Sequence, residues 1–340
     1  MGTKKTLSLS IKKALVTGGG GFVGKAVVKQ LLELGVETSV LGRHHYPDIE
    51  NIGGRCIVGN INDTSIMDQA TKGVDIVFHV AALAGIWGAW KEYYTTNVLG
   101  TEVVVSSCKK NDVSMLVYTS TPSVVFNRED IKGSDESLAY AEDFLCFYAR
   151  SKVIAERAVL EANSTSLLTC AIRPHLIWGP GDPHLIPRLL ESGRKKTLKR
   201  VGDGFNLVDI SYIDNVAYAH ILAAKNLSEI GTAAGKPYFI SQGDPVNLWD
   251  WINELFILMN IDEVQASVSF PVAYRLGAFL EAIYKFTRSK KEPKMTRFLA
   301  EQLAKSHYFS IKNAQHDLGY EPVISTPEGL ERTQQWLKER

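Results

Sequence analysis

The amino-acid sequence predicts an α/β protein in which a doubly wound parallel sheet carries a smaller, mostly helical C-terminal domain. Short apolar runs with strand character alternate with helical segments as far as residue 241, the pattern of a parallel sheet covered by helices on both faces. From Leu248 onward the helical period dominates. We therefore expect one domain from residues 11–175 and 207–242, and a second, cap-like region from residues 176–206 and 243–340.

The composition is that of an ordinary globular protein of 340 residues, with 45% hydrophobic residues, 22% charged residues and a net charge of +1. The length allows a large buried core, and the charge balance predicts no general affinity for nucleic acid. No stretch is apolar and long enough to predict a transmembrane segment, and no signal-peptide pattern precedes the first strand. Four widely spaced cysteines predict reduced thiols in a cytoplasmic protein and no metal site: Cys56, Cys108, Cys146 and Cys170.

The first predicted strand, Lys13–Thr17, runs directly into a glycine-rich turn, after which helical spacing resumes. Strand, glycine turn and helix in this order form the fingerprint of a dinucleotide-binding sheet of the Rossmann type. Gly18 permits the tight turn, Gly21 lets the backbone approach a pyrophosphate, and Gly24 allows close packing of helix and strand. The helix N-terminus supplies amide groups for the phosphates. The predicted cofactor contacts here are Gly18, Gly20, Gly21, Phe22, Val23 and Gly24.

The residues after the second strand, 37–41, indicate which dinucleotide binds. An NAD site usually has a carboxylate here that accepts hydrogen bonds from the ribose 2′-hydroxyl. This chain has Gly42-Arg43-His44 instead, and the guanidinium of Arg43 can pair with a 2′-phosphate. A solvated arginine at a strand end is the alternative interpretation. We predict NADPH rather than NADH as the cofactor, and the domain of residues 11–175 and 207–242 as the NADP-binding domain.

Two further strands, 55–59 and 74–80, precede residues that are expected to line the cofactor site. Asn60 and Ile61 fall in a loop predicted to lie beneath the adenine. The run 74–80 is almost wholly apolar, as expected of a central parallel strand. Ala81 and Ala82 then keep the side chains small where the cofactor must pass.

A cluster of hydroxyl side chains follows the fifth strand, 113–118. Thr119, Ser120, Thr121 and Ser123 stand at the carboxyl end of a central parallel strand, which is where a doubly wound sheet binds its ligand. The sixth and last strands of the sheet are predicted at residues 167–173 and 237–241.

Tyr148 and Lys152 are four residues apart and share one face of a helix predicted at residues 147–160. In that position the ammonium can stabilise the phenolate and lower the pKa of the tyrosine from about 10. Such a phenol can give a proton to a carbonyl oxygen, or take one from an alcohol, near neutral pH. A Tyr-x-x-x-Lys pair alone is mostly an ordinary surface arrangement, so this prediction depends on the nucleotide site that precedes it.

Together these motifs resemble the extended short-chain dehydrogenase/reductase superfamily, in the order that the superfamily has them. The resemblance spans residues 13–182 and is carried by Thr17-Gly18-x-x-Gly21-x-x-Gly24, Ala81-Ala82, Asn97, Tyr118-Thr119-Ser120-Thr121, Tyr148-x-x-x-Lys152 and Arg173-Pro174 before Gly179-Pro180.

The resemblance implies a role for each matching side chain. Tyr148 would be the proton donor and acceptor, Lys152 would lower its pKa and hold the nicotinamide ribose, and Asn97 would belong to a proton relay. Thr121 stands where the superfamily has a catalytic serine; it keeps the hydroxyl, and two neighbouring hydroxyls are the alternatives, Ser120 and Ser123. Two residues would border the nicotinamide, Pro174 and His175.

Within the superfamily the chain resembles the 3β-hydroxysteroid dehydrogenase-like branch, and in it the ketoreductases of bacterial long-chain olefin biosynthesis. The resembling segments run through nearly the whole chain, from residues 77–88 to 296–303. Such enzymes use NADPH to reduce the C3 ketone of a long-chain 2-alkyl-3-oxoalkanoate to the 3-hydroxy acid. The resemblance implies a long-chain acyl substrate, held in an apolar channel by Trp87, Trp90 and the helix at residues 270–286.

Three other functions share the predicted fold. A 3β-hydroxysteroid or 4α-carboxysterol 3-dehydrogenase has the same chemistry and differs only in its pocket. A sugar-nucleotide epimerase or dehydratase would need an arginine for the diphosphate where this chain has Val208. A non-catalytic NADP-binding regulator would not need the intact pair of Tyr148 and Lys152.

The helix predicted at residues 270–286 is broadly apolar and is followed by basic residues up to Lys294. It could be a cap packed on its own domain, a lid over an alkyl chain, or a face that meets a membrane surface or a partner enzyme. The sequence leaves these alternatives open. It also leaves open a homodimer and an association with other enzymes of the same pathway.

Overall fold

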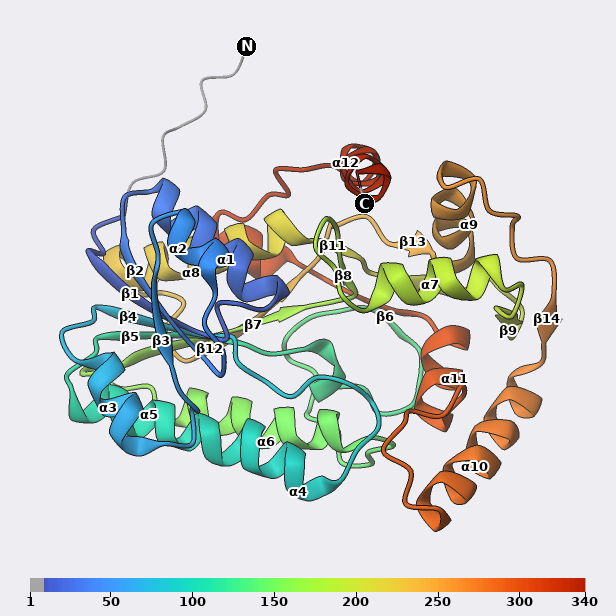
Figure 1. Cartoon of the computed structure of the whole chain (residues 1–340), viewed down its shortest axis with the longest axis horizontal. Coiled ribbons are helices and arrows are strands. Elements are labelled where there is room, and N and C mark those ends of the chain that lie inside the picture. The colour runs from blue at the N-terminus through green and yellow to red at the C-terminus, as the bar shows by residue number, and fades with distance from the viewer. Residues whose placement is uncertain (1–8, 340) are drawn as a thin grey trace.

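A computed structural model describes residues 9–339, and at its centre lies a seven-stranded sheet (Figure 1). The strand order is β12-β7-β5-β4-β1-β2-β3, and all neighbouring strands pair in parallel. This confirms the predicted parallel sheet, and each predicted strand lies within two residues of the observed one. The strands are β1 (Lys13–Thr17), β2 (Glu37–Gly42), β3 (Arg55–Val58), β4 (Ile76–His79), β5 (Met115–Thr119), β7 (Leu168–Pro174) and β12 (Lys236–Ile240).

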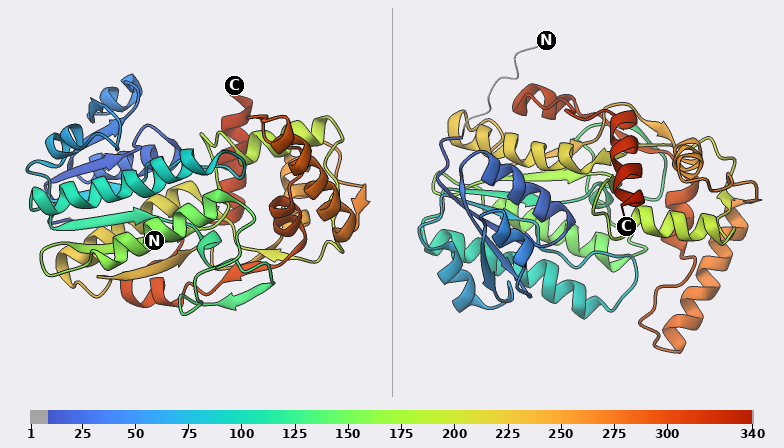
Figure 2. Two further views of the ribbon diagram at one scale, coloured as in Figure 1. Left: turned by 90° about the horizontal axis from the view of Figure 1, so that it is seen from below. Right: turned by 45° about the horizontal axis from the view of Figure 1, so that its top comes forward.

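Helices cover both faces of the sheet, because successive residues of a strand point to opposite sides. Ala14 and Val16 of β1 belong to the core on one face, whereas Leu15 belongs to the core on the other face. Figure 2 shows the sheet between its two helical layers. The first layer contains α1 (Phe22–Glu33) and α8 (Ile213–Glu229), and the second contains α3 (Thr64–Thr71), α5 (Gly100–Lys110) and α6 (Phe147–Glu161).

The strand order reverses between β1 and β4. The chain runs from β1 outward to β2 and β3, and then returns to β4 on the opposite side of β1. Such a reversal opens a crevice at the carboxyl ends of the strands. The glycine turn after β1 and the segment that begins at Ala81 after β4 both lie at this crevice.

The helical segment that carries Asn97 is interrupted. It consists of α4 (Trp90–Tyr93), a π-helical turn (Tyr94–Leu99) and α5, and the buried Asn97 lies in the π-helical turn. Single π-helical turns inside helices are frequent at functional sites. Sequence periodicity does not distinguish them from a regular helix, because apolar residues keep nearly the same spacing.

A smaller, mostly helical part of the chain lies at the carboxyl edge of the sheet (Figure 1). Its own core contains the buried tryptophans Trp178, Trp249 and Trp251. Its helices are α7 (Leu185–Arg194), α9 (Leu248–Leu258), α10 (Phe270–Phe286), α11 (Arg297–Ala304) and α12 (Thr326–Lys338). No helix among residues 9–339 combines the length and the apolar character that crossing a bilayer requires.

Short strands and turns complete the fold. Four of the strands form a small sheet in the order β13-β10-β15-β6, which joins residues distant in the chain. Strands of two to four residues are too short to show a period of two. The remaining elements are α2 (Pro47–Asn51), η2 (Pro122–Val124), β6 (Ile131–Ser134), β8 (Ile177–Trp178), β9 (Arg200–Val201), β10 (Leu207–Val208), β11 (Ser211–Tyr212), β13 (Val246–Asn247), β14 (Ser267–Val268), β15 (His307–Phe309) and η3 (Ala314–Leu318).

Candidate active site

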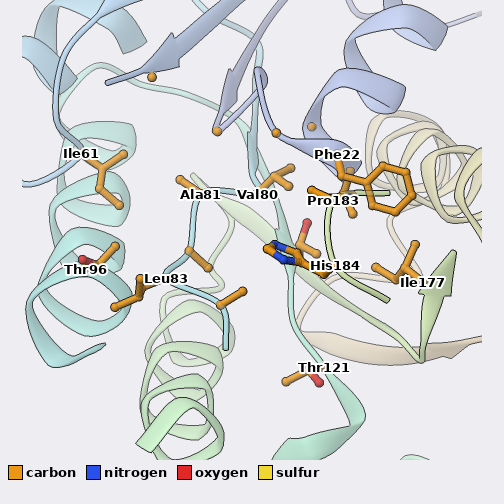
Figure 3. Close-up of a pocket in the computed structure, with 18 of the residues that line it drawn as sticks. Phe22, Ile61, Val80, Ala81, Leu83, Thr96, Thr121, Ile177, Pro183 and His184 are labelled. Carbon is orange, nitrogen blue, oxygen red and sulfur yellow. The ribbon is translucent and has the colours of Figure 1, made fainter. Parts of the chain in front are cut away.

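A cleft of about 580 Å³ opens at the carboxyl edge of the sheet, beside the glycine turn (Figure 3). The residues that follow β1, β2, β4 and β5 form its walls, together with the first turns of α6 and α7. Most of the site residues predicted from the sequence line it: Gly18, Gly21, Phe22, Val23, Gly24, Arg43, Asn60, Ile61, Ala81, Ala82, Thr121, Tyr148, Lys152 and Pro174.

The glycine turn has the geometry of a phosphate cradle. A Cβ on Gly24 would lie 2.2 Å from the carbonyl oxygen of Gly18, and Gly18 itself has a φ of +70°. Side chains are therefore excluded at both positions. A Cβ on Gly21 would lie 3.3 Å from the same Gly18 oxygen, which is a tight contact with the backbone. Gly21 is the N-cap residue of α1, and no side chain of the described residues accepts a hydrogen bond from the first-turn amides there. These amides are therefore available to bind a pyrophosphate.

Gly20 is not part of the cleft wall, and its neighbour in space is Tyr46. A Cβ on Gly20 would lie 2.1 Å from the Tyr46 ring, and a Cβ on Gly42 would lie 2.7 Å from the Tyr46 hydroxyl. The Tyr46 ring thus packs against both glycines, and Tyr46 lines the cleft together with Arg43. Tyr46 is not among the residues predicted from the sequence, although its place just after the second strand is a signal that could have found it.

Arg43, which follows β2, is not paired with any of the neighbouring acidic side chains and can bind a ligand. Its side chain is exposed, lines the cleft, and has no hydrogen bond or ion pair within residues 9–339. The acids that follow it are already paired, Asp48 with Lys25 and Glu50 with His45. A carboxylate for a ribose 2′-hydroxyl is thus missing from this stretch of the described chain, while a guanidinium for a phosphate is present.

Tyr148 and Thr121 meet at the cleft. Thr121 Oγ1 donates a hydrogen bond to Ser123 Oγ at 3.2 Å. Burial raises the pKa of Tyr148 above its ordinary value, which outweighs the lowering effect of the nearby Thr121 side chain. The phenol is therefore protonated at neutral pH.

Lys152 does not lower the pKa of Tyr148 in this arrangement, contrary to the expectation from the sequence. Its ammonium donates to the carbonyl oxygen of Thr119 at 2.6 Å and lies 4.1 Å from the centre of the Tyr118 ring. Lys152 is only 2% exposed, and burial lowers its pKa to about 7. Glu156, one turn further along α6, acts in the opposite direction and raises this pKa.

Asn97 fastens the segment after β4 to α6. Its side-chain oxygen accepts a hydrogen bond from the Leu83 amide at 2.7 Å, and its Nδ2 donates to the Leu83 carbonyl at 3.0 Å. The same Nδ2 donates to Ser151 Oγ at 2.9 Å. Asn97 is buried behind the cleft wall, while the adjacent Thr96 lines the cleft. Its part in a proton relay stays a prediction.

Of the other predicted site residues, some line the cleft and others lie outside its wall. Ser120 lines the cleft, and its buried hydroxyl has no partner among the described residues. His175 lies outside the cleft wall, because its Nε2 is bound to Nδ1 of the buried His307 at 2.7 Å. Trp90 packs on Phe147, with ring centroids 5.7 Å apart. No group of three or more His, Cys, Asp or Glu side chains suited to a metal ion occurs between residues 9 and 339.

A second pocket, of about 470 Å³, lies at the N-terminal end of α6. Cys146 and Phe147, which directly precede Tyr148, form part of its wall. Trp87 forms another part; its indole nitrogen donates to the Ser289 carbonyl at 3.2 Å, and its ring packs edge-on against Tyr284. The wall also contains three basic side chains at the end of α10: Lys285, Arg288 and Lys290.

One segment of the cleft wall is not among the site residues predicted from the sequence. Residues 182–185, at the N-terminal end of α7, border the cleft, and Figure 3 shows Pro183 and His184 among the side chains that line it. Asp182 shapes this turn, because its carboxylate accepts hydrogen bonds from the amides of His184, Leu185 and Ile186. The segment brings residues of the C-terminal part to the mouth of the predicted nucleotide site.

A family model described as the 3-beta hydroxysteroid dehydrogenase/isomerase family matches residues 15–272. The chain belongs to this family. As a 3-beta hydroxysteroid dehydrogenase/isomerase family member, it is an oxidoreductase that acts on CH–OH or C=O groups with a nicotinamide cofactor, NAD(P).

Relatives within the family differ in the substrate that their names state. The chain is 46% identical to the 2-alkyl-3-oxoalkanoate reductase of Stenotrophomonas maltophilia (strain K279a), over 94% of this chain and 98% of that protein. It is 35% identical to the decarboxylating sterol-4-alpha-carboxylate 3-dehydrogenase of Mus musculus, over 98% of this chain and 93% of that protein. A solved structure of a dTDP-glucose 4,6-dehydratase from Streptomyces venezuelae with NAD bound shares the fold, with a TM-score of 0.75 and 23% identity. The match covers 96% of this chain and 97% of that chain.

Proposed function

We propose that this protein is an NADPH-dependent ketoreductase that reduces the C3 ketone of a long-chain 2-alkyl-3-oxoalkanoate to the 3-hydroxy acid, a step of hydrocarbon (olefin) biosynthesis. The observation that carries the proposal is the 46% identity to a reductase named for this substrate. That similarity covers 94% of the chain and so includes the C-terminal part as well as the sheet.

Tyr148 is the proton donor in this proposal. Its half-buried phenol is protonated at neutral pH, which is the form that the reduction of a ketone requires. The nicotinamide cofactor supplies the hydride. Thr121, which lines the same cleft as the phenol, supports the negative charge that develops on the ketone oxygen. Lys152 holds the nicotinamide ribose and balances the phenolate that remains after the proton has left.

The proposed cofactor preference is for NADPH over NADH. The cradle formed by Gly18, Gly21 and Gly24 fits the pyrophosphate that both cofactors share. Arg43 supports the distinction between them, because it is an unpaired cation in the described chain and lines the cleft after β2.

The second pocket is the proposed place of the substrate. It adjoins the helix turn that carries Tyr148, and Trp87, Phe147 and Tyr284 give it apolar walls for an alkyl chain. Each buried CH₂ group contributes about 0.8 kcal/mol, so affinity should rise with chain length until the pocket is filled. The basic side chain of Arg288, at the rim of the same pocket, suits the carboxylate of a 3-oxo acid.

The test is steady-state kinetics with 3-oxo acids of increasing length, beside a panel of 3β-hydroxysteroids. Under the proposal kcat/KM rises with chain length and then levels off, and the steroids are poor substrates. The 35% identity to a sterol-4-alpha-carboxylate 3-dehydrogenase supports the second candidate function, a sterol 3-dehydrogenase. A value of kcat/KM that is flat with chain length, together with faster turnover of a steroid, would favour that candidate.

A further inference from the structure

The outer face of α10 carries a row of exposed apolar side chains. Their spacing of four and three residues places them on one stripe along the helix. Figure 1 shows α10 at the edge of the molecule, away from the sheet. The exposed fractions are 54% for Val272, 48% for Leu276, 63% for Phe279, 39% for Ile283 and 90% for Phe286.

The opposite face of α10 is already packed. Ala273, Gly277 and Glu281 are buried there, and a Cβ on Gly277 would lie 2.6 Å from the backbone of Thr296. The Glu281 carboxylate accepts two hydrogen bonds from the Arg297 guanidinium, at 3.0 Å and 2.8 Å. One face therefore attaches the helix to the protein, and the apolar stripe on the other face requires a different explanation.

The charges around the stripe are almost all positive. The segment 270–294 contains two acids, and both are paired: Glu281 with Arg297, and Glu292 with Arg188. It also contains six exposed cations: Arg275, Lys285, Arg288, Lys290, Lys291 and Lys294. An apolar stripe beside such a group of cations has the chemistry of an interfacial helix that binds anionic lipid.

We propose that α10 docks this protein on the surface of an anionic phospholipid bilayer. The apolar stripe enters the boundary between head groups and acyl chains, and the cations contact the lipid phosphates. A second copy of the chain fits this face poorly, because two-fold pairing would bring two sets of six cations together. The contact is peripheral, since only one side of α10 is free.

Docking through α10 would also place the second pocket at the lipid surface. Tyr284, Lys285 and Arg288 of this segment line that pocket, opposite Phe147 at the start of α6. A substrate with long alkyl chains could then pass from the lipid into the pocket with little contact with water. This consequence rests on the proposed function, whereas the docking itself does not.

The experiment is flotation of the full-length chain with vesicles. We expect the protein to float with vesicles of equal parts phosphatidylcholine and phosphatidylglycerol, and to bind phosphatidylcholine vesicles at least about tenfold more weakly. Raising the salt from about 0.1 M to about 1 M should weaken the binding, because the Debye length falls from about 10 Å to about 3 Å.

Two double variants separate the apolar from the electrostatic part. Phe279→Ser with Phe286→Ser should weaken binding by about tenfold or more, and so should Lys290→Glu with Lys291→Glu. The matched control is Ile230→Ser, because Ile230 is 70% exposed but lies after α8. It should bind like the wild type, and thermal unfolding curves should show that all variants are folded.

Three vesicle-binding results would overturn the proposal. These are absence of binding to the anionic vesicles, equal binding to both vesicle types, and unchanged binding of the two double variants. A concentration-dependent dimer in sedimentation that Phe279→Ser with Phe286→Ser abolishes would also overturn it, by showing that a second copy covers the stripe. Because flotation is measured without turnover, its outcome is independent of which ketone the enzyme reduces.

Discussion

The Lys152 ammonium donates a hydrogen bond to the carbonyl oxygen of Thr119, with 2.6 Å between the two atoms. This bond ties α6 to the carboxyl end of β5, two residues before Thr121. Tyr148 lies one turn before Lys152 on the same helix, so the bond also helps to determine where the phenol reaches the cleft. The proposed proton donor and its hydroxyl partner thus come from two elements that a buried lysine connects.

Replacing Tyr148 by Phe should remove the proton donor and leave the fold intact, because only one hydroxyl is lost. We expect kcat to fall by about 10²-fold or more, with unchanged affinity for NADPH measured by fluorescence titration. Tyr218→Phe is the matched control, since Tyr218 packs on the sheet core away from the cleft. Turnover of Tyr148→Phe within a few-fold of the wild type would assign the proton transfer to another residue.

The hydroxyl of Thr121, rather than its methyl group, should matter for catalysis. Thr121→Val keeps the shape but loses the hydroxyl in the cleft wall beside Tyr148, so kcat should fall by about 10²-fold. Thr121→Ser keeps the hydroxyl and should retain most of the activity. Ser123→Ala tests the neighbouring hydroxyl, which receives a hydrogen bond from Thr121 at 3.2 Å. If Ser123→Ala is the more damaging change, the assignment to Thr121 is wrong.

Arg43→Ala should weaken the binding of NADPH much more than that of NADH, because only NADPH carries the 2′-phosphate. Loss of one guanidinium–phosphate contact should raise the Kd for NADPH by about tenfold or more. His44→Ala, at the next exposed residue, is the control. Isothermal titration with both cofactors measures the effect, and equal losses for the two cofactors would contradict the proposed preference.

The sheet and the glycine turn could be predicted because their signals are local. Each strand is a short apolar run bounded by turn residues, and β1 was predicted with its observed bounds, Lys13–Thr17. The same holds for α10, whose predicted and observed bounds agree at Phe270–Phe286. In such segments the period of the apolar residues and the flanking breakers are enough to define the element.

Contacts between distant residues could not be predicted in the same way. Helical spacing places Tyr148 and Lys152 on one face, but only the packing of α6 on β5 brings the ammonium to the Thr119 carbonyl. Similarly, His175 binds His307 across 132 residues, which takes it away from the cleft. The pairing depends on the small sheet that contains β15, and strands of two or three residues leave no pattern in the sequence.

Asp209 should make the stability of the protein depend on pH. Its carboxylate is 2% exposed and accepts a hydrogen bond from the Phe309 amide at 2.7 Å. Burial raises its pKa from 3.8 to about 7, although the hydrogen bonds from the Phe309 amide and the Ser241 side chain act to lower it. Between these two values the folded state binds more protons than the unfolded state.

The free energy of unfolding contributed by Asp209 should therefore fall as the pH rises from about 4 to about 7. The expected loss is about 4 kcal/mol, from roughly three pKa units at about 1.4 kcal/mol each. Asp209→Asn removes this dependence, because the amide is neutral throughout and its oxygen can still accept from Phe309. Urea unfolding at about pH 5 and about pH 8 measures the effect, with the exposed Asp244→Asn as control. The advantage of Asp209→Asn over the wild type should be about 3 kcal/mol larger at the higher pH, because roughly two of the three pKa units lie above pH 5. An equal difference at both pH values would contradict the proposed buried proton.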